Sequence, residues 1–378
     1  MNFLLDWKLR IPLLGVLFVF ISYYLHLVLG AFYAPEYLYG ALNLLTYLLC
    51  PIVVISTLKY FDKNILLMYF LIFTFFIIMI FSNNSYYMDY YDFLKFFSYL
   101  AAGFLFFLFL KDYDDDFYLY GFFYFLISIS TFNFDPAILD YLYYADAYVL
   151  LSFLMLFFAK NIYSYIFIFI VSVVSLYFIN SRSALFFFIG SFSLLMVYIY
   201  GLRKSFMILI PMFFVIYGII FYLYENTDIQ GNRVLRIIFS SDDDTSFNER
   251  NIINEYAKQA FLNSPFVGAY GDYRGVFGYG KYAHNYFSFL SEYGFFGGIF
   301  LVAMYIYLLK SIFLIFYNKY LFRVIRGDFK MVLLICVYAL LGITFTKTYR
   351  WFFLYLSIGF SLSFLFFYYG KFYQLSKK

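Results

Sequence analysis

The residues best suited to chemistry in this sequence are one histidine and a set of arginines. His284 stands directly before Asn285 and a long apolar run. Histidine ordinarily has a pKa of about 6.5, so it can accept a proton from a hydroxyl group near neutral pH. A histidine at the edge of an apolar run can equally be a packing residue, and its position alone leaves both interpretations open.

The arginines lie in segments that carry few other cations. They are Arg182, Arg233, Arg236, Arg250, Arg274 and Arg350. A guanidinium stays charged at any relevant pH and binds phosphate through two parallel hydrogen bonds. Arg182, in Asn180-Ser181-Arg182-Ser183-Ala184, can also be read as a turn residue whose side chain reaches the membrane surface. Taken together, these arginines favour an anionic ligand.

Glu292 is unusual because it is an acid inside an apolar run. An acid within a membrane span needs a polar partner or a water-filled cavity. It is therefore either a substrate-binding group or a residue that makes a structural hydrogen bond to a neighbouring helix.

The sequence shows no pattern of metal ligands. The triplet Asp242-Asp243-Asp244 lacks the glycine and the regular oxygen spacing of a calcium loop, so we read it as a solvated turn. Cys50 and Cys336 each lie in an apolar run without ligand spacing, and we expect free packing residues. We therefore predict neither a metal nor a cofactor.

The elements that position these residues must be membrane helices. Of the 378 residues, 65% are hydrophobic and 13% are charged, against about 45–50% and 25% in soluble domains. This much apolar surface requires lipid as its solvent, which excludes a soluble enzyme, a DNA-binding module, a disordered protein and a secreted disulfide scaffold. The net charge of +4 is too small to indicate a nucleic-acid partner.

Runs of about 20 mostly apolar residues predict twelve membrane helices in one polytopic domain over residues 1–378. The predicted spans are Ile11–Gly30, Tyr37–Leu58, Ile65–Phe81, Phe93–Leu110, Phe117–Thr131, Ala147–Ala159, Ile162–Ile179, Ala184–Tyr200, Phe206–Tyr224, Asn285–Leu309, Met331–Thr346 and Phe352–Tyr369.

Lysine and arginine bias between alternate connections predicts that both termini face the cytoplasm. Inner segments then carry the basic residues Lys8, Arg10, Lys59, Lys63, Lys111, Lys160, Arg203, Lys204, Lys310, Lys319, Arg323, Arg326, Lys330, Lys371, Lys377 and Lys378. The short outer connections carry acids instead: Glu36, Asp89, Asp92, Asp135, Asp140 and Asp146.

One large hydrophilic loop, residues 225–284, lies between the ninth and tenth predicted spans and faces outward. Ser246-Phe247-Asn248-Glu249 has the capping-box pattern of a helix start. Apolar residues recur after it at helical spacing, which predicts an amphipathic helix near residues 247–262 that ends before Pro265.

Several of these motifs, in this order, resemble the membrane-embedded O-antigen polymerase and O-antigen ligase superfamily. They are Ser181-Arg182-Ser183-Ala184-Leu185, then Asn248-Glu249-Arg250, Asn263-Ser264-Pro265 with Gly268 and Gly271, Ala283-His284-Asn285, and Glu292-Tyr293-Gly294-Phe295-Phe296-Gly297. The resemblance covers about residues 180–185 and 247–298. Elsewhere the helices are similar only in number and hydrophobicity.

The resemblance implies a metal-independent glycosyltransferase of the GT-C type in the bacterial inner membrane. Its donor and acceptor are undecaprenyl-diphosphate-linked oligosaccharides at the periplasmic face, with membrane lipid and a chain-length regulator protein as further partners. By position, Arg182 and Arg250 are expected to hold the diphosphate, and His284 is the expected general base. Asn285 and Glu292 match orienting positions, and Arg233, Arg274 and Arg350 are further candidates for substrate binding.

The chemistry agrees with these residue types, because a diphosphate leaves readily once cations neutralise its charge. Polymerase and ligase differ in the acceptor, which is a lipid-linked repeat unit or lipid A–core. Eight residues, Tyr286 to Tyr293, separate Asn285 from Gly294, one fewer than in the ligase form, and this favours polymerase.

Two other classes stay open. A twelve-helix transporter, such as a flippase for lipid-linked oligosaccharides, is expected to place polar groups near mid-membrane, whereas this chain concentrates them in one outer loop. A non-catalytic assembly subunit is the other alternative.

The charge bias makes a topology prediction. Reporter fusions after Asp89, Tyr141 and Asp243 should report an external location, and fusions after Asp62, Arg203 and Asp328 a cytoplasmic one. A cytoplasmic signal at Asp243 would contradict the assignment of the large loop to the outer face.

Overall fold

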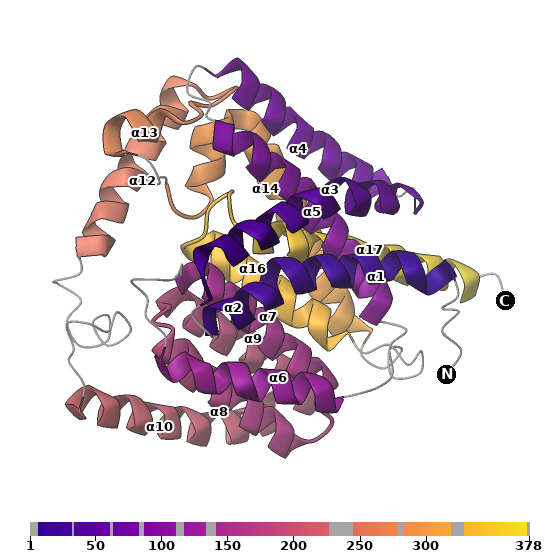
Figure 1. The fold of residues 1–378 in the computed structure, drawn as a ribbon, viewed down its shortest axis with the longest axis vertical. Helices are drawn as coiled ribbons and strands as arrows, with labels where there is room; N and C mark the ends of the chain where they lie inside the picture. The colour runs from indigo at the N-terminus through magenta and orange to yellow at the C-terminus, as the bar shows by residue number, and fades with distance from the viewer. Residues whose placement is uncertain are drawn as a thin grey trace.

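The computed structural model describes residues 7–31, 34–60, 63–82, 87–110, 117–133, 141–226, 245–278, 283–318 and 329–375 (Figure 1). Every regular element in these ranges is a helix, and no strand occurs among them. This agrees with the predicted all-α class. A chain that crosses lipid must satisfy its backbone hydrogen bonds internally, and helices do so within each segment.

The helices follow the apolar runs of the sequence in order. Their bounds are α1 Trp7–Val19, the π-helix η1 Phe20–Tyr24, α2 Leu25–Ala31, α3 Glu36–Leu58, α4 Lys63–Phe81, α5 Tyr87–Leu110, α6 Phe117–Ser130, the 3-10 turn η2 Thr131–Asn133, α7 Tyr141–Phe158, α8 Ile162–Phe178, α9 Arg182–Tyr200, α10 Leu202–Asn226, α12 Thr245–Asn263, α13 Asp272–Phe277, α14 Phe287–Tyr317, α16 Lys330–Phe345 and α17 Phe352–Leu375.

Within the described residues, eight helices are long and apolar enough to cross a membrane: Ile11–Gly30, Tyr37–Leu58, Lys63–Phe81, Asp89–Leu110, Tyr141–Phe158, Arg182–Tyr200, Phe287–Tyr317 and Phe352–Gly370. Three shorter apolar helices lie at Gly121–Ser130, Ile162–Phe178 and Lys330–Phe345. The twelve predicted spans all fall on helices. Within the described residues, eight of these helices have the length and composition for a full crossing, α6, α8 and α16 are shorter apolar helices, and α10 is in neither group.

Helix α5 lies in the middle of the bundle, between α1, α3 and α17 (Figure 1). Two glycines set its distance from α17. A Cβ on Gly103 would overlap the backbone oxygen of Leu356, and a Cβ on Gly359 would overlap that of Leu100. Small residues at a membrane-helix crossing let the two backbones approach closely. Gly15 has the same role between α1 and α5, where its Cβ would lie 2.8 Å from Ala102 O.

Polar side chains join α6, α7 and α8 inside the apolar bundle. The Tyr124 hydroxyl and Ser172 Oγ lie 2.6 Å apart, and Ser172 Oγ donates to Ser152 Oγ at 3.0 Å. The hydroxyls of Ser128 and Tyr148 lie 2.7 Å apart. Within a membrane the lipid is as apolar as the helix surfaces, so the hydrophobic effect does not drive helices together. Hydrogen bonds between helices, such as these, then contribute to their association.

Contacts between distant segments sort the helix ends into two groups. Ser82 Oγ donates to Tyr270 O at 3.1 Å, and both residues belong to segments predicted to face outward. Lys330 Nζ donates to Ala159 O at 2.9 Å, and both lie in segments predicted to face the cytoplasm. In Figure 1 the start of α1 and the end of α17 lie on the right, and α12 and α13 lie on the left.

The predicted tenth span is not one straight helix. Helix α14 is interrupted at Gly294, which has φ 55° and ψ −134°. At this break the backbone N–H of Phe295 donates to Pro265 O at 2.8 Å and to Phe266 O at 3.1 Å. A Cβ on Gly294 would lie 2.6 Å from Pro265 O and 2.7 Å from Gly268 N. The break therefore receives the loop that follows α12.

Helix α12 covers the region where an amphipathic helix near residues 247–262 was predicted, and it begins slightly earlier, at Thr245. Its buried face carries Ile253 and Ala257, which pack with Tyr273 and Ala283 in a small core separate from the main one. Helices α12 and α13 and the return to α14 thus form a compact module on the bundle.

The α5–α17 crossing gives a stability prediction. Gly103→Ala should destabilise the protein by about 1–3 kcal/mol, because the new methyl group collides with backbone rather than with a movable side chain. Gly40→Ala is the matched control, since no atom lies within 4 Å of its Cβ position. Thermal unfolding in lipid nanodiscs measures both, and equal midpoints for the two variants would contradict the close crossing.

Candidate functional site

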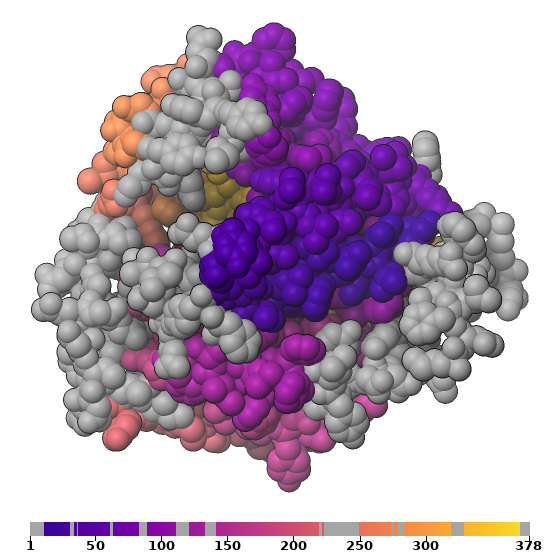
Figure 2. Space-filling model, viewed as in Figure 1, coloured from indigo at the N-terminus to yellow at the C-terminus, as the bar shows by residue number. Residues whose placement is uncertain are grey.

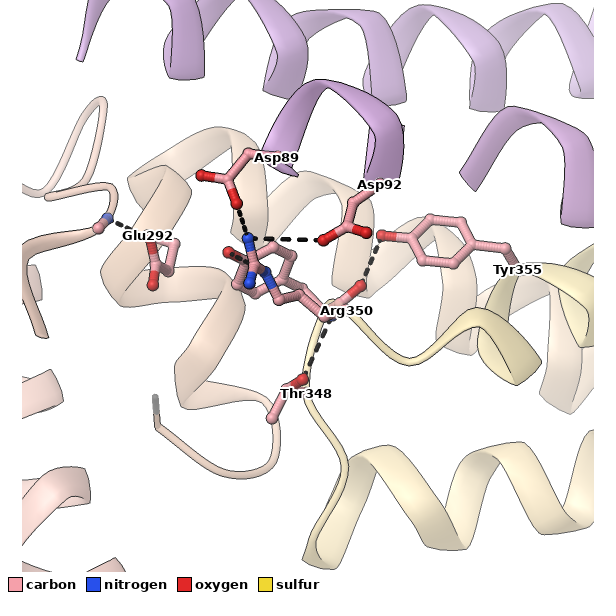
Figure 3. A network of polar contacts seen from close by, with 8 residues as sticks. Asp89, Asp92, Glu292, Thr348, Arg350 and Tyr355 are labelled. Atoms are coloured by element: carbon pink, nitrogen blue, oxygen red, sulfur yellow. Dashed lines mark hydrogen bonds and ion pairs between the residues drawn. The ribbon is translucent and has the colours of Figure 1, made fainter. Parts of the chain in front are cut away.

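The turn between α16 and α17, residues 346–351, gathers charged side chains from distant helices. Arg350 Nη2 pairs with Asp89 Oδ1 at the start of α5 and lies 3.6 Å from Asp92 Oδ2, as Figure 3 shows. Arg350 Nε donates to the Tyr349 hydroxyl at 3.2 Å. The side chain of Asp89 is fully buried and that of Arg350 is 17% exposed. Arg350, predicted to bind substrate, is thus paired with two carboxylates.

The second cation of this turn, Lys347, is buried against Asp146 of α7. Lys347 Nζ lies 2.9 Å from Asp146 Oδ2 and 3.2 Å from Oδ1. The Tyr338 hydroxyl donates to Oδ1 at 2.7 Å, and Trp351 Nε1 donates to Oδ2 at 2.6 Å. Burying a charged side chain in apolar surroundings costs free energy unless an opposite charge and hydrogen-bond partners compensate it. Here Lys347 and Asp146 neutralise each other, and Tyr338 and Trp351 donate hydrogen bonds to the carboxylate.

His284 contacts the first residue of the same turn. Its Nδ1 lies 3.0 Å from Thr346 O, and its backbone N–H donates to Asn254 Oδ1 on α12 at 3.1 Å. The ring is half-buried. His284 therefore stands between the α12 module and the α16–α17 turn.

The sequence predicted that the tenth span begins at Asn285. In the structure Asn285 precedes the helix, and its backbone is in the left-handed region, with φ 62°. Its Oδ1 accepts the backbone N–H of Phe287, the first residue of α14, at 3.0 Å. Asn180, next to the segment that begins with Ser181 and Arg182, has φ 64°. These are the two non-glycine residues with positive φ in the described ranges, and such strain tends to occur at functional positions.

Glu292 is 3% exposed and accepts the backbone N–H of Gly271 at Oε2, 2.7 Å away. In Figure 3 its carboxyl group points toward that N–H and lies beside the Arg350 cluster. The backbone of Gly268 also lies close to the backbone of Glu292, because a Cβ on Gly268 would be 2.5 Å from Glu292 O. Among its contacts, then, Glu292 makes a structural hydrogen bond, but its partner lies in the loop after α12 and not on a neighbouring helix as expected.

Arg250 lies on α12 one turn before Asn254, so the two side chains share a helix face. Because Asn254 holds the backbone of His284, this face of α12 is turned toward the histidine. Arg182 is the first residue of α9 and is half-buried. Helix α9 packs against α16, whose end leads into the turn.

Three of the six arginines singled out in the sequence lie partly or wholly outside the described residues. Arg274 is in α13, but its side chain is not among the described ones. Arg233, like the aspartate triplet and Arg236, lies outside the described ranges.

Tyr270 and Tyr273, in the segment between α12 and α14, are poor proton acceptors. Burial, and then the charge of Glu292, raise the pKa of Tyr273 well above its ordinary value. Burial and the neighbouring Tyr349 do the same for the pKa of Tyr270. Both phenols stay protonated, and Tyr273 hydrogen-bonds with Ser291 Oγ.

Figure 2 shows a hollow between the indigo N-terminal helices and the orange α12, with yellow atoms of the C-terminal part of the chain at its floor. A separate groove of about 530 Å³ lies between α6, α7 and α8 and includes Asn161 and Ser164. That groove is mostly apolar and belongs to the predicted cytoplasmic ends of these helices.

The structure connects His284, Asn285, Glu292 and Arg350 through the turn and α14, since the Tyr349 backbone N–H donates to Ser288 Oγ at 3.0 Å. Sequence reasoning missed Lys347 altogether and treated Asp89, Asp92 and Asp146 only as outer acids. A signal was present: Lys347 and Asp146 each lie at the edge of an apolar run, where an ion needs a partner.

Comparisons of the chain with protein-family models, with curated proteins and with solved structures give no match.

The Glu292–Gly271 bond gives a prediction about the loop after α12. Glu292→Ala removes a charged acceptor and should speed hydrogen exchange of the 268–272 backbone by about tenfold or more. Glu292→Gln retains an oxygen acceptor and should give an intermediate rate. Exchange mass spectrometry measures both, and unchanged exchange in Glu292→Ala would show that the bond does not hold the loop.

Proposed function

We propose that this protein is a surface-polysaccharide polymerase of the bacterial inner membrane. It transfers a glycan chain from undecaprenyl diphosphate to the next lipid-linked repeat unit at the periplasmic face. The proposal combines the resemblance of the motifs around Arg182, Arg250 and His284 with the arrangement of the described residues.

The observation that carries the proposal is the bond between Asn254 and the backbone of His284. It turns the helix face that includes Arg250 toward a histidine. Glycosyl transfer from a lipid diphosphate requires a cation for the leaving group and a proton acceptor for the attacking hydroxyl. The cation stabilises the leaving diphosphate, and the base takes the proton of the attacking sugar hydroxyl.

The position of these groups also favours transfer over transport. His284 lies three residues before the start of α14, and α12 lies on the bundle rather than within it (Figure 1). His284 and the α12 face that includes Arg250 therefore lie at one end of α14. A transporter is expected to place its binding groups near the middle of its spans.

The catalytic prediction concerns His284. His284→Ala should lower polymerisation by about 10²-fold or more, because general-base catalysis typically contributes about 10²–10⁴-fold. In the wild type the rate should fall at acid pH, where a protonated ring cannot accept a proton, and His284→Gln should lose that limb. His26→Gln, at the other histidine, is the control and should retain activity. Full-rate polymerisation by His284→Ala would remove the base from the mechanism.

The arginine prediction uses the same assay. Arg182→Lys and Arg250→Lys keep the charge but lose the planar two-bond contact with phosphate, and both should be strongly impaired. Arg203→Ala, an exposed arginine at the start of α10, is the matched control. Purified protein with a lipid-linked repeat as the sole substrate separates the alternatives, because a ligase needs lipid A–core to form product. Normal polymer from both arginine variants would assign these residues to structure.

A further inference from the structure

The contact of His284 with the α16–α17 turn fixes which ring nitrogen carries the proton. Thr346 O lies 3.0 Å from Nδ1 and, as a carbonyl oxygen, can only accept a hydrogen bond. Nδ1 therefore carries the hydrogen. In the neutral ring, the lone pair that can accept a proton then belongs to Nε2.

The Thr346 carbonyl is itself held by the turn. The backbone N–H groups of Thr346 and Lys347 both donate to Gly342 O, at 2.9 and 2.7 Å. A Cβ on Gly342 would collide with the Trp351 ring, so only glycine allows this closure. The position of the carbonyl thus depends on where Lys347 and Trp351 are anchored.

The side chains of Lys347 and Trp351 both bind the carboxylate of Asp146. Lys347 binds Asp146 through both carboxylate oxygens, and Trp351 Nε1 donates to Oδ2. Asp146 is 4% exposed and Lys347 is 8% exposed, so water competes little for these bonds. The residue next to Thr346 and the last residue of the turn are therefore tied to the same point on α7.

We propose that the Lys347–Asp146 pair is the positioning device of His284. It holds the Thr346 carbonyl so that His284 keeps its proton on Nδ1 and offers Nε2 to the acceptor sugar. Lys347 and Asp146 act through the turn and are positioning residues. The inference rests on the proposed function for its chemical meaning.

In that reaction Nε2 takes the proton of the sugar hydroxyl as its oxygen bonds to the anomeric carbon of the donor. The bond from that carbon to the diphosphate oxygen breaks, and the diphosphate leaves with the electron pair. The proton stays on Nε2 until it returns to solvent. The Nδ1–H bond to Thr346 O persists throughout, because that nitrogen is a donor in both states of the ring.

A purely structural ion pair predicts a different outcome. Replacing a buried pair with apolar groups often leaves a fold stable. Removal of both charges should then have no effect on His284 if the pair only joins α7 to α16. Under our proposal, the histidine loses its defined tautomer even when the fold is retained.

The test uses the fact that the chain has two histidines. His26→Gln leaves His284 as the one histidine, and ¹⁵N-histidine labelling in lipid nanodiscs at alkaline pH reports its tautomer directly. When Lys347 is unaltered, the spectrum of His284 should show a protonated Nδ1 and an unprotonated Nε2. Adding Lys347→Met should give a mixture of tautomers, whereas Lys347→Arg should keep the original one.

Two controls separate positioning from folding. Asp146→Asn combined with Lys347→Met leaves no unpaired charge, so it should fold and still show mixed tautomers. Lys330→Met removes a lysine that is equally buried, 8% exposed, but bonded to Ala159 O and the Tyr165 hydroxyl at the other helix ends. It should leave the His284 tautomer unchanged.

The same variants are then assayed for transfer. The double variant should lose about tenfold or more in kcat with little change in KM, since a misplaced base affects the chemical step. Protonated Nε2 in the protein with Lys347 intact, or an unchanged tautomer in the double variant, overturns the proposal. A tautomer that responds as expected in a protein without transferase activity refutes the proposed function and leaves the positioning intact.

Discussion

Two cations in the short turn between α16 and α17 have to be neutralised away from water, and this requirement determines how the helix ends around the turn meet. Lys347 finds its partner on α7 and Arg350 finds its partners on α5. The Tyr349 backbone binds Ser288 of α14, and the turn itself joins α16 to α17. Removing one partner of a buried pair typically costs about 3–5 kcal/mol, because the other charge is left uncompensated. The turn therefore fixes five helices relative to one another.

The second constraint is the close approach of two glycine-containing segments. Gly268 and Gly294 let the loop after α12 enter the break in α14, and Glu292 binds the Gly271 N–H in the same place. Much of the resemblance to the polymerase and ligase superfamily lies in these segments. Their glycines and glutamate have a packing explanation here. The proposed chemistry therefore depends on Arg182, Arg250 and His284.

Sequence patterns predicted the positions of the helices because long apolar runs leave few other ways to satisfy a backbone in lipid. They also predicted a helix in the outer loop. They did not predict the break at Gly294, since glycine within an apolar run is common and the break depends on Pro265, which lies far back in the chain. The twelve predicted spans include α6, α8 and α16, whose described apolar helices are shorter than the length used to recognise a full crossing.

The candidate site was predictable in its residue types but not in its pairing. Hydropathy identifies an acid or a cation at the edge of a span, but it does not say which of several helices supplies the partner. Asp146 and Lys347 are separated by 201 positions, and Asp89 and Arg350 by 261. Their meeting depends on helix packing, which in turn depends on contacts such as Gly103 against Leu356. Only the assembled bundle defines these pairs.

This pairing also decides which arginines are suited to an anionic ligand. Arg350 faces Asp89 and Asp92, and Lys95, which lies one turn along α5, also interacts with Asp92. That cluster carries no net charge, so a diphosphate gains little there and would have to displace carboxylates. The Lys347–Asp146 pair is neutral for the same reason.

Under the proposed function, the positive potential for a diphosphate would therefore come from other cations at this end of the bundle. Arg182 begins α9, where the helix dipole adds to its charge, and Arg250 shares a face with the residue that holds His284. Under the proposed function, the cations that hold the structure and the cations that bind the ligand are therefore different residues. The turn fixes the helix ends, and Arg182 on α9 and Arg250 on α12 are the arginines proposed to bind the anion.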